Sequence, residues 1–259
     1  MAFNAKAAAR YILEAHQARA RFQNLPAAIG PGSLAEAYDA QEALHSFFSG
    51  KYGPSAGVKI ATTTKVMQEL MGIDGPSFGV IFSERVHQSP AKLKLQDFTS
   101  LKVECEVAVR LGDDLPASAS GYTAATVSPL VEAIMPAFEL VEDRMADYNN
   151  TNALSLIADN CWNAGVVLGQ AVPYTPGLEL HGLAGSLSIN GQVQKHGRTE
   201  EPLVAVAWVA NMAAERGRPL RKGQIVMTGS IIPTLAINSG DRWMLNIDSI
   251  GEVELRVRP

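Results

Sequence analysis

Two glutamates, Glu104 and Glu106, lie two positions apart in the otherwise largely apolar run of residues 101–109. Successive side chains of a strand point to opposite faces, so both carboxylates would share one face. Like charges this close oppose each other's ionisation, and an enclosed pair therefore requires a cation or a shared proton. Such a pair is also common as the solvent-facing stripe of an amphipathic strand, so the spacing alone leaves both interpretations open.

A third carboxylate, Glu139, occurs in residues 134–141, a run that is otherwise apolar enough to be buried. A buried charge needs a partner. If Glu139 converges with Glu104 and Glu106, the three would bind one hard divalent cation, Mg²⁺ or Mn²⁺, and leave coordination positions for water and substrate. These residues are therefore the candidate metal ligands.

Lys59 is a lone cation in the short apolar run of residues 57–60 and comes two positions after a glycine. If it is buried beside a metal ion, its pKa would fall and it could exchange protons near neutral pH. The alternative is a lysine at a strand edge that extends its ammonium group into solvent.

Several residues farther along the chain are candidates for contact with a ligand. Asp159, followed by Asn160, could orient a water or a metal-bound ligand, or could cap a helix or make a turn. Gly229 and Ser230 follow a predicted strand, where free backbone amides could hold a carboxylate or an enolate, although an ordinary loop is the alternative. Three apolar candidates for the pocket wall, for which core packing is the alternative, are Phe82, Trp162 and Leu235.

The elements that must position these side chains change in character along the chain. Apolar residues have helical spacing over residues 5–22 and 34–49, and Ser33 followed by Glu36 is the start signal of the second helix. The fold class is therefore α+β, with a helical N-terminal region at residues 1–55 and a strand-rich body at residues 56–259. Strand-like runs occur at residues 57–60, 78–82, 101–111, 134–141, 224–228, 242–247 and 252–257.

Two local signals refine this picture of the body. Asn190-Gly191 lies between apolar runs and predicts a two-residue hairpin turn, because both positions tolerate positive φ. Residues 203–216 predict a helix that ends before Gly217 and Pro219.

Composition excludes several classes of function. The chain has 259 residues, 47% hydrophobic and 19% charged, which is enough for one large core. A formal net charge of -4 argues against nucleic acid or anionic lipid as a partner and favours a small-molecule substrate. The two cysteines provide neither a disulfide framework nor a CxxC site, and no run of about 18 apolar residues predicts a membrane span. We therefore expect a cytoplasmic protein.

The motifs occur in a specific order: Gly57-Val58-Lys59-Ile60, Glu104-x-Glu106, Pro136-Ala137-Phe138-Glu139, Ile157-Ala158-Asp159-Asn160, Ala207-Trp208-Val209-Ala210-Asn211 and Thr228-Gly229-Ser230. From about residue 30 to the C-terminus, this set resembles the 2-keto-4-pentenoate hydratase and 4-oxalocrotonate decarboxylase family of the fumarylacetoacetate hydrolase superfamily. The resemblance implies a mixed β-roll body, a Mg²⁺ or Mn²⁺ ion on Glu104, Glu106 and Glu139, and Lys59 as the acid/base group. It also implies a small 2-oxo or 2-hydroxy-dienoate acid from aromatic-ring breakdown as substrate, and a homo-oligomer.

The resemblance favours hydration of a 2-hydroxy-2,4-dienoate to a 4-hydroxy-2-oxo acid. Decarboxylation of a 2-oxo-3-enedioate, keto-enol tautomerisation or oxaloacetate decarboxylation, and non-catalytic ligand binding are the alternatives. An HxxE motif, which is typical of the carbon-carbon hydrolases of the superfamily, does not occur. The chain departs from the family pattern at residues 195–203 and at Ser77, where some hydratases have an acidic residue, so substrate choice and proton transfer stay open.

Overall fold

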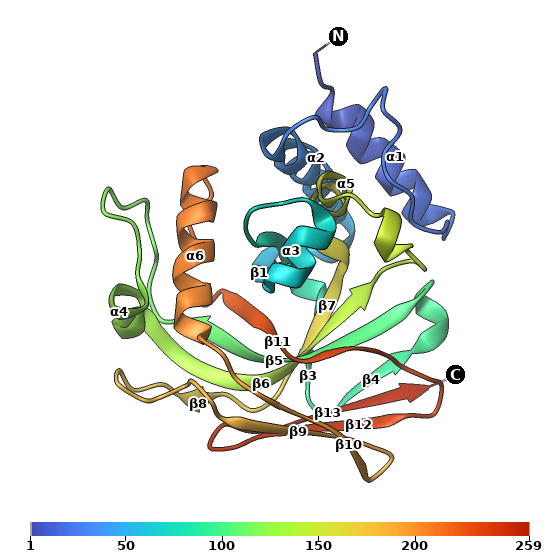
Figure 1. Ribbon diagram of the computed structural model, residues 1–259. Coiled ribbons are helices and arrows are strands. Elements are labelled where there is room, and N and C mark those ends of the chain that lie inside the picture. Colours follow the sequence, from blue (N-terminus) through green and yellow to red (C-terminus); the bar gives the residue numbers. More distant parts are fainter. Residues whose placement is uncertain (1, 259) are drawn as a thin grey trace.

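Two curved mixed sheets form the centre of the computed structural model, which describes residues 2–258 (Figure 1). The helices are α1 (Ala5–Gln17), α2 (Leu34–Tyr52), α3 (Lys65–Met71), α4 (Ala124–Val127), α5 (Ala153–Ala158) and α6 (Pro202–Glu215). Short 3₁₀ turns occur at Ser83–Arg85, Leu95–Asp97, Ser128–Leu130, Tyr148–Asn150 and Asn160–Trp162. The strands are β1 (Ser55–Ala61), β2 (Ser77–Phe82), β3 (Val86–Gln88), β4 (Ala91–Lys94), β5 (Leu101–Leu111), β6 (Val131–Glu142), β7 (Asn163–Leu168), β8 (Val172–Pro173), β9 (Ala184–Ile189), β10 (Gln192–Arg198), β11 (Ile225–Ala236), β12 (Arg242–Ile247) and β13 (Gly251–Arg258).

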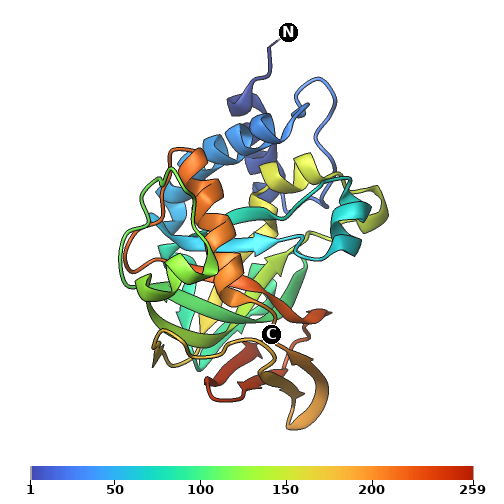
Figure 2. The ribbon, with the colours of Figure 1, turned by 60° about the vertical axis from the view of Figure 1, so that its left-hand side comes forward.

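The strands pair in two groups. The larger sheet has the order β2-β1-β11-β5-β6-β7-β3, with β8 paired beside β6, and the smaller sheet has the order β10-β9-β12-β13-β4. The N-terminal helices and the smaller sheet lie at opposite ends of the molecule, and α6 lies along the side of the larger sheet (Figure 2). The predicted α+β fold class is confirmed.

The two N-terminal helices differ in detail from the prediction. α1 ends at Gln17 rather than at residue 22, because Arg19 turns the chain with a φ of 52°. At the start of α2, the Ser33 side chain accepts a hydrogen bond from the Glu36 amide, as predicted. The Glu36 carboxylate accepts from the Gly32 amide at 2.7 Å, one residue before the amide that a capping box would use.

The antiparallel pair of β5 and β6 confirms the alternation predicted for residues 101–109. Val103, Cys105, Val107 and Val109 are buried in the main hydrophobic core. The opposite face of β5 therefore carries both glutamates of the Glu-x-Glu motif, and Glu104 lies directly across from Glu139 of β6 in the register of the two strands.

The smaller sheet packs on the face of β6 that points away from the glutamates. Phe138 of β6 and Trp243 of β12 are both 0% exposed, and their rings meet edge to face with centroids 6.2 Å apart. Aromatic pairs of this geometry stabilise a core beyond the area that they bury. Because neighbouring strand residues point to opposite faces, Glu139 faces the side on which α3 and α5 lie.

Most predictions for the C-terminal half agree with the structure, but β11 continues to Ala236, so Gly229 and Ser230 lie within this strand rather than after it. Asn190 and Gly191, with φ values of 53° and 81°, connect β9 to β10 as a hairpin. Helix α6 lies within one residue of its predicted bounds. Among residues 2–258, no helix is both long and apolar enough to cross a membrane.

A candidate metal centre and its cavity

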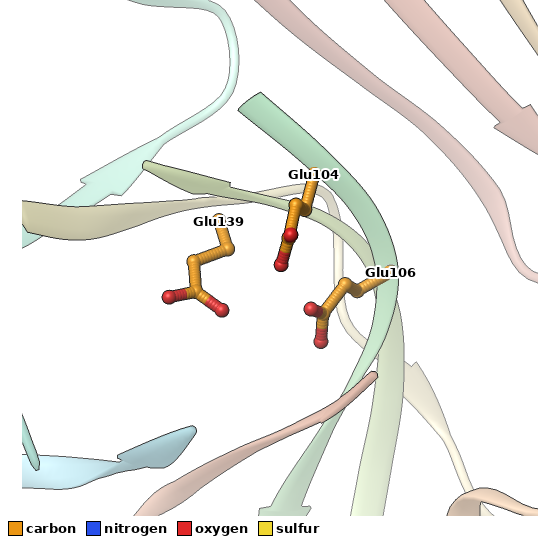
Figure 3. A group of neighbouring side chains, drawn as sticks. All are labelled: Glu104, Glu106 and Glu139. Carbon is orange, nitrogen blue, oxygen red and sulfur yellow. The ribbon is translucent and has the colours of Figure 1, made fainter. Parts of the chain in front are cut away.

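Three carboxylates from two neighbouring strands converge on one point (Figure 3). One side-chain oxygen from each of Glu104, Glu106 and Glu139 lies within 4.8 Å of the others. The register of β5 and β6 brings Glu104 and Glu139 opposite each other, and Glu106 follows two residues along the same face. Thr234 of β11 donates a hydrogen bond to Glu104 Oε1 and fixes that side chain.

Glu106 and Glu139 each have one oxygen bound by a protein donor and one left over. The Gly229 amide donates to Glu106 Oε2 at 2.9 Å, and Asn163 Nδ2 donates to Glu139 Oε1 at 3.1 Å. Within residues 2–258, the buried oxygens Glu106 Oε1 and Glu139 Oε2 have no hydrogen-bond partner. An unpartnered buried carboxylate oxygen is costly, so this arrangement fits a bound cation.

The electrostatics of the three glutamates also fit a cation. Burial raises the pKa of Glu106 well above its ordinary value, and the charges of Glu139 and Glu104 raise it further. Burial raises the pKa of Glu139 to about 7, although Lys59 opposes the shift. A donor set made only of carboxylates is of the kind that binds Mg²⁺ or Mn²⁺. The positive charge of such an ion would offset the negative charges of the three glutamates.

Lys59 is buried and paired, so the interpretation as a solvent-reaching lysine is wrong. Its side chain is 3% exposed, and Nζ lies 2.9 Å from Glu139 Oε1. Burial lowers the pKa of Lys59, but the negative charges of Glu139 and Glu104 outweigh burial and leave the pKa above its ordinary value. The predicted fall in pKa therefore does not follow from the protein groups, which hold Lys59 as a cation.

A glycine allows β1 to bring Lys59 close to the centre. β1 and β11 are parallel, and a Cβ atom on Gly57 would lie 2.0 Å from the carbonyl oxygen of Ile225. No side chain fits at that distance, so the glycine two residues before Lys59 is required by the approach of the two strands.

A cavity of about 600 Å³ adjoins the glutamates, and Lys59 and Glu104 form part of its wall. Its polar lining includes Lys102 and Tyr148, and α3 covers one side. The apolar part of the wall consists of Met67, Met71, Val141, Leu156 and Trp162. A small organic acid of the predicted class fits a cavity of this size.

A left-handed turn places two residues in the cavity wall. Asn160, Cys161 and Trp162 have φ values of 52°, 48° and 57°, and such values are costly for residues other than glycine. The Asn160 side chain holds the turn, because it accepts from the Val80 amide at 2.7 Å and donates to the Val80 carbonyl at 2.9 Å. Gly79 leaves room for the turn, since a Cβ there would lie 2.5 Å from the Asn160 carbonyl oxygen.

Asp159 lies beside this turn but does not line the cavity. Its carboxylate is 2% exposed and accepts from His16 Nε2 at 2.6 Å and from the Arg144 guanidinium. Asp159 faces a separate cavity under α1. The bond from His16 to Asp159 helps to attach α1 to the body. The carboxylate is committed to these two partners, and the geometry favours a structural role.

The remaining candidates divide between the cavity and the core. Trp162 and Ser230 line the cavity, whereas the Gly229 amide donates a hydrogen bond to Glu106. Phe82 lies on the other side of β1 and β2, in a cavity under α2. Leu235 packs against the main core across from Val103. The structure thus brings together the glutamates, Lys59, Trp162 and the 229–230 segment, but not Asp159, Phe82 or Leu235.

Three residues at the site, Asn163, Thr234 and Lys102, are not among the candidates that the sequence predicts. Asn163 and Thr234 bind the glutamates, and no spacing rule identifies them. Lys102 shares the face of Glu104 by the same alternation that identified Glu106, so this signal was available.

Ser77, the residue that departs from the family pattern, is fully buried. Its hydroxyl lies 3.1 Å from Thr62 Oγ1 and 3.5 Å from Cys161 Sγ.

Comparison with known proteins agrees with this geometry. The C-terminal family of fumarylacetoacetate (FAA) hydrolase matches residues 63–258. The 2-keto-4-pentenoate hydratase of Paraburkholderia xenovorans is 33% identical over 202 residues, 76% of this chain and 74% of that protein. The 2-hydroxyhexa-2,4-dienoate hydratase of Comamonas testosteroni is 29% identical over 206 residues, 77% of each chain.

A solved structure shares the fold over almost the whole chain. The 4-oxalocrotonate decarboxylase from Pseudomonas putida G7, complexed with magnesium and adipate, superposes with a TM-score of 0.89 at 22% identity. The superposition covers 98% of this chain and 97% of the decarboxylase.

Proposed function

Because the chain belongs to the fumarylacetoacetate hydrolase family, we propose that it is a metal-dependent hydratase. It would add water to a 2-hydroxy-2,4-dienoate, a product of aromatic-ring breakdown, and release a 4-hydroxy-2-oxo acid. The observation that carries this proposal is the group of three glutamates with two buried oxygens that lack a partner within residues 2–258. The hydratase names of the relatives support it.

Glu104, Glu106 and Glu139 would hold the ion, which we take to be Mg²⁺ or Mn²⁺. When bound, such an ion supplies Lewis-acid stabilisation of negative charge on the carboxylate and C2 oxygen of a 2-oxo or 2-hydroxy acid. Gly229, Asn163 and Thr234 would fix the glutamates through the hydrogen bonds already described.

Lys59 would move the proton in the first half of the reaction. Its ammonium group lines the cavity and is held 2.9 Å from Glu139, so it is a positioned acid. Ketonisation removes the proton of the C2 hydroxyl and adds one at C5, which leaves a double bond between C3 and C4 conjugated to the C2 carbonyl. Water then adds its oxygen at C4 and a proton at C3.

Asp159 would act as a positioning residue rather than as a catalytic one. It binds His16 and Arg144 and directly precedes the left-handed turn that carries Trp162 into the cavity wall. Loss of its charge would therefore disturb the wall of the cavity without removing a group that touches substrate.

The decisive assay uses protein stripped of metal and then reloaded with Mg²⁺ or Mn²⁺. With 2-hydroxypenta-2,4-dienoate, we expect metal-dependent loss of the dienol absorbance and formation of 4-hydroxy-2-oxopentanoate. Conversion of a 2-oxo-3-enedioate with release of carbon dioxide, and no hydration, would identify a decarboxylase instead. Absence of bound metal after reloading would overturn the role proposed for the three glutamates.

A further inference from the structure

Lys102 presents a second cation to the cavity, and its charge is already paired. It lies two positions before Glu104 on the same face of β5. Its Nζ is 2.6 Å from Oδ2 of Asp143, a residue that is 0% exposed. The Tyr148 hydroxyl donates to the same oxygen at 3.1 Å, and Lys102 Nζ lies 4.6 Å from the Tyr148 ring centroid. Lys102 therefore has a carboxylate partner behind the cavity wall.

The charges around the cavity leave no spare positive group for a second substrate carboxylate. Among residues 2–258, two lysine ammonium groups and one carboxylate line the cavity, and three buried carboxylates lie directly behind them, paired with the lysines or grouped with the lining glutamate, so the formal charge of this set is -2. They are Lys59, Lys102, Glu104, Glu106, Glu139 and Asp143. A divalent ion offsets this charge, and the C1 carboxylate of the substrate then adds one negative charge. Another carboxylate at the far end of the substrate would be brought among like charges.

The apolar part of the wall is suited to an uncharged tail. Met67, Met71, Val141, Leu156 and Trp162 supply apolar surface, and methionine side chains adapt to tails of different length. A carboxylate against this surface would lose its water without gaining a partner.

We infer that the cavity selects 2-hydroxydienoates with an uncharged alkyl tail, and that Asp143 enforces the selection by neutralising Lys102. This inference rests on the proposed function and names the substrate class within it. Asp143 and Lys102 are thus specificity-determining residues, and Lys102 freed of Asp143 would accept a distal carboxylate.

The test compares two 2-oxo acids of equal chain length that lack the double bonds needed for turnover. 2-Oxohexanoate has an alkyl tail, and 2-oxoadipate has a carboxylate at the same position. Their Kd values for the Mg²⁺-loaded protein are measured by titration calorimetry, which does not depend on activity. We expect wild-type protein to bind 2-oxohexanoate more tightly by about tenfold or more, since one unfavourable charge contact of roughly 1.4 kcal/mol has this effect.

Three variants distinguish an effect of the Lys102 charge on binding from an effect of damage to the fold. Asp143→Asn should reduce the preference for 2-oxohexanoate or reverse it, because Lys102 is then unpaired. The double variant Lys102→Met/Asp143→Asn should keep the wild-type preference, because it removes both charges together. Asp113→Asn, at an exposed carboxylate after β5, is the matched control and should leave both Kd values unchanged.

Each outcome bears on a different claim. Equal or tighter binding of 2-oxoadipate by the wild-type protein would overturn the inference and leave the hydratase proposal standing. An unchanged preference in folded Asp143→Asn protein would show that Asp143 does not set the selection. Failure of both acids to bind in the presence of Mg²⁺ would overturn the inference, and the turnover assay with 2-hydroxypenta-2,4-dienoate would decide the proposed function separately.

Discussion

Glu106 and Glu139 are buried carboxyl groups, and the stability of their charged forms depends on whether a cation lies beside them. Without a cation, burial and the charges of neighbouring glutamates raise the pKa of both, so the charged state destabilises the fold. With a divalent cation, the same carboxylates become ligands and the repulsion becomes attraction. The proposed metal binding would therefore be coupled to folding at these residues.

Glu106→Gln should abolish metal-dependent turnover and leave the fold intact. Because the amide removes one buried charge from the cluster, the metal-free variant should melt at or above the wild-type Tm. Wild-type protein should gain about 2.7 kcal/mol of stability at a metal concentration of 100 Kd, and the variant much less. Thermal melts with and without Mg²⁺ measure this, with exposed Glu132→Gln as the control. An equal metal-induced shift in Glu106→Gln would contradict the assignment of this ligand.

Lys59→Met should reduce kcat by about 100-fold or more, because a positioned acid/base group typically contributes this much. Methionine keeps most of the volume of the buried side chain, so KM should change little and the metal-induced Tm shift should persist. Solvent deuterium incorporation at C5 of the substrate should slow in parallel with kcat. Exposed Lys92→Met is the control, and undiminished deuterium incorporation in Lys59→Met would rule out the proposed proton transfer.

At the scale of elements, neighbouring residues stabilise the strained turn at residues 160–162. Three consecutive residues with positive φ persist because β2 supplies hydrogen bonds to Asn160 and because Gly79 leaves space beside it. The turn connects α5 to β7 and sets the direction of Cys161 and Trp162. Its geometry therefore controls part of the cavity wall.

Asn160→Ala should lower the free energy of unfolding by about 2–3 kcal/mol, because the Val80 amide and carbonyl and the His45 ring lose their partner. It should also lower kcat/KM, since Trp162 would no longer be held in place. Urea unfolding and steady-state kinetics measure the two effects. Exposed Asn149→Ala provides the comparison, and equal stability of the two variants would show that the Asn160 bonds contribute nothing.

At the scale of the whole molecule, the N-terminal segment is fastened to the body at several points. His16 binds Asp159, the Phe22 amide donates to the Arg144 carbonyl, and the Leu25 amide donates to Ser155 Oγ. Helix α2 packs against α5 and β2. The helices therefore stabilise the same elements that form the back of the cavity wall.

His45 of α2 should make the molecule sensitive to acid. Burial lowers its pKa to about 4, so the unfolded chain takes up a proton near its ordinary value of 6.5 while the folded chain does not. The stability is fully present above that value and is lost as pH falls from about 6.5 to 4, by at most roughly 3 kcal/mol. Urea unfolding at pH 7 and pH 4.5 should show a smaller loss for His45→Gln than for wild type. The exposed His196→Gln should behave as wild type, and equal losses in all three proteins would contradict the role of His45.

We expect the protein to form a homo-oligomer, as the family resemblance implies. Val66 and Leu70 lie one turn apart on α3 and are 73% and 43% exposed, which is costly for an apolar pair in water. Light scattering after size exclusion should give a multiple of the 27.7 kDa chain mass. A monomer at micromolar concentration would contradict this prediction, and Val66→Lys tests whether α3 takes part in the assembly.

The sequence by itself determined the α+β class and the alternation along β5, and it identified three glutamates and one lysine as candidates that the family resemblance grouped into one site. These follow from local rules: the period of a strand, the cost of an isolated buried charge and the turn preference of Asn190-Gly191. It was less reliable where several residues share the same local pattern. Asp159, Phe82 and Leu235 were plausible by position, yet each lies outside the cavity that adjoins the glutamates.

Only the tertiary structure decided which oxygens of the glutamates are left without a partner and what compensates each buried charge. Lys59 stays charged because Glu139 reaches it from another strand, and Lys102 is neutralised by Asp143 from beyond the end of β6. The physical reason is that pKa and charge pairing depend on distances of a few ångströms between segments far apart in the chain. Strand register and loop geometry fix those distances, and no local sequence signal records them.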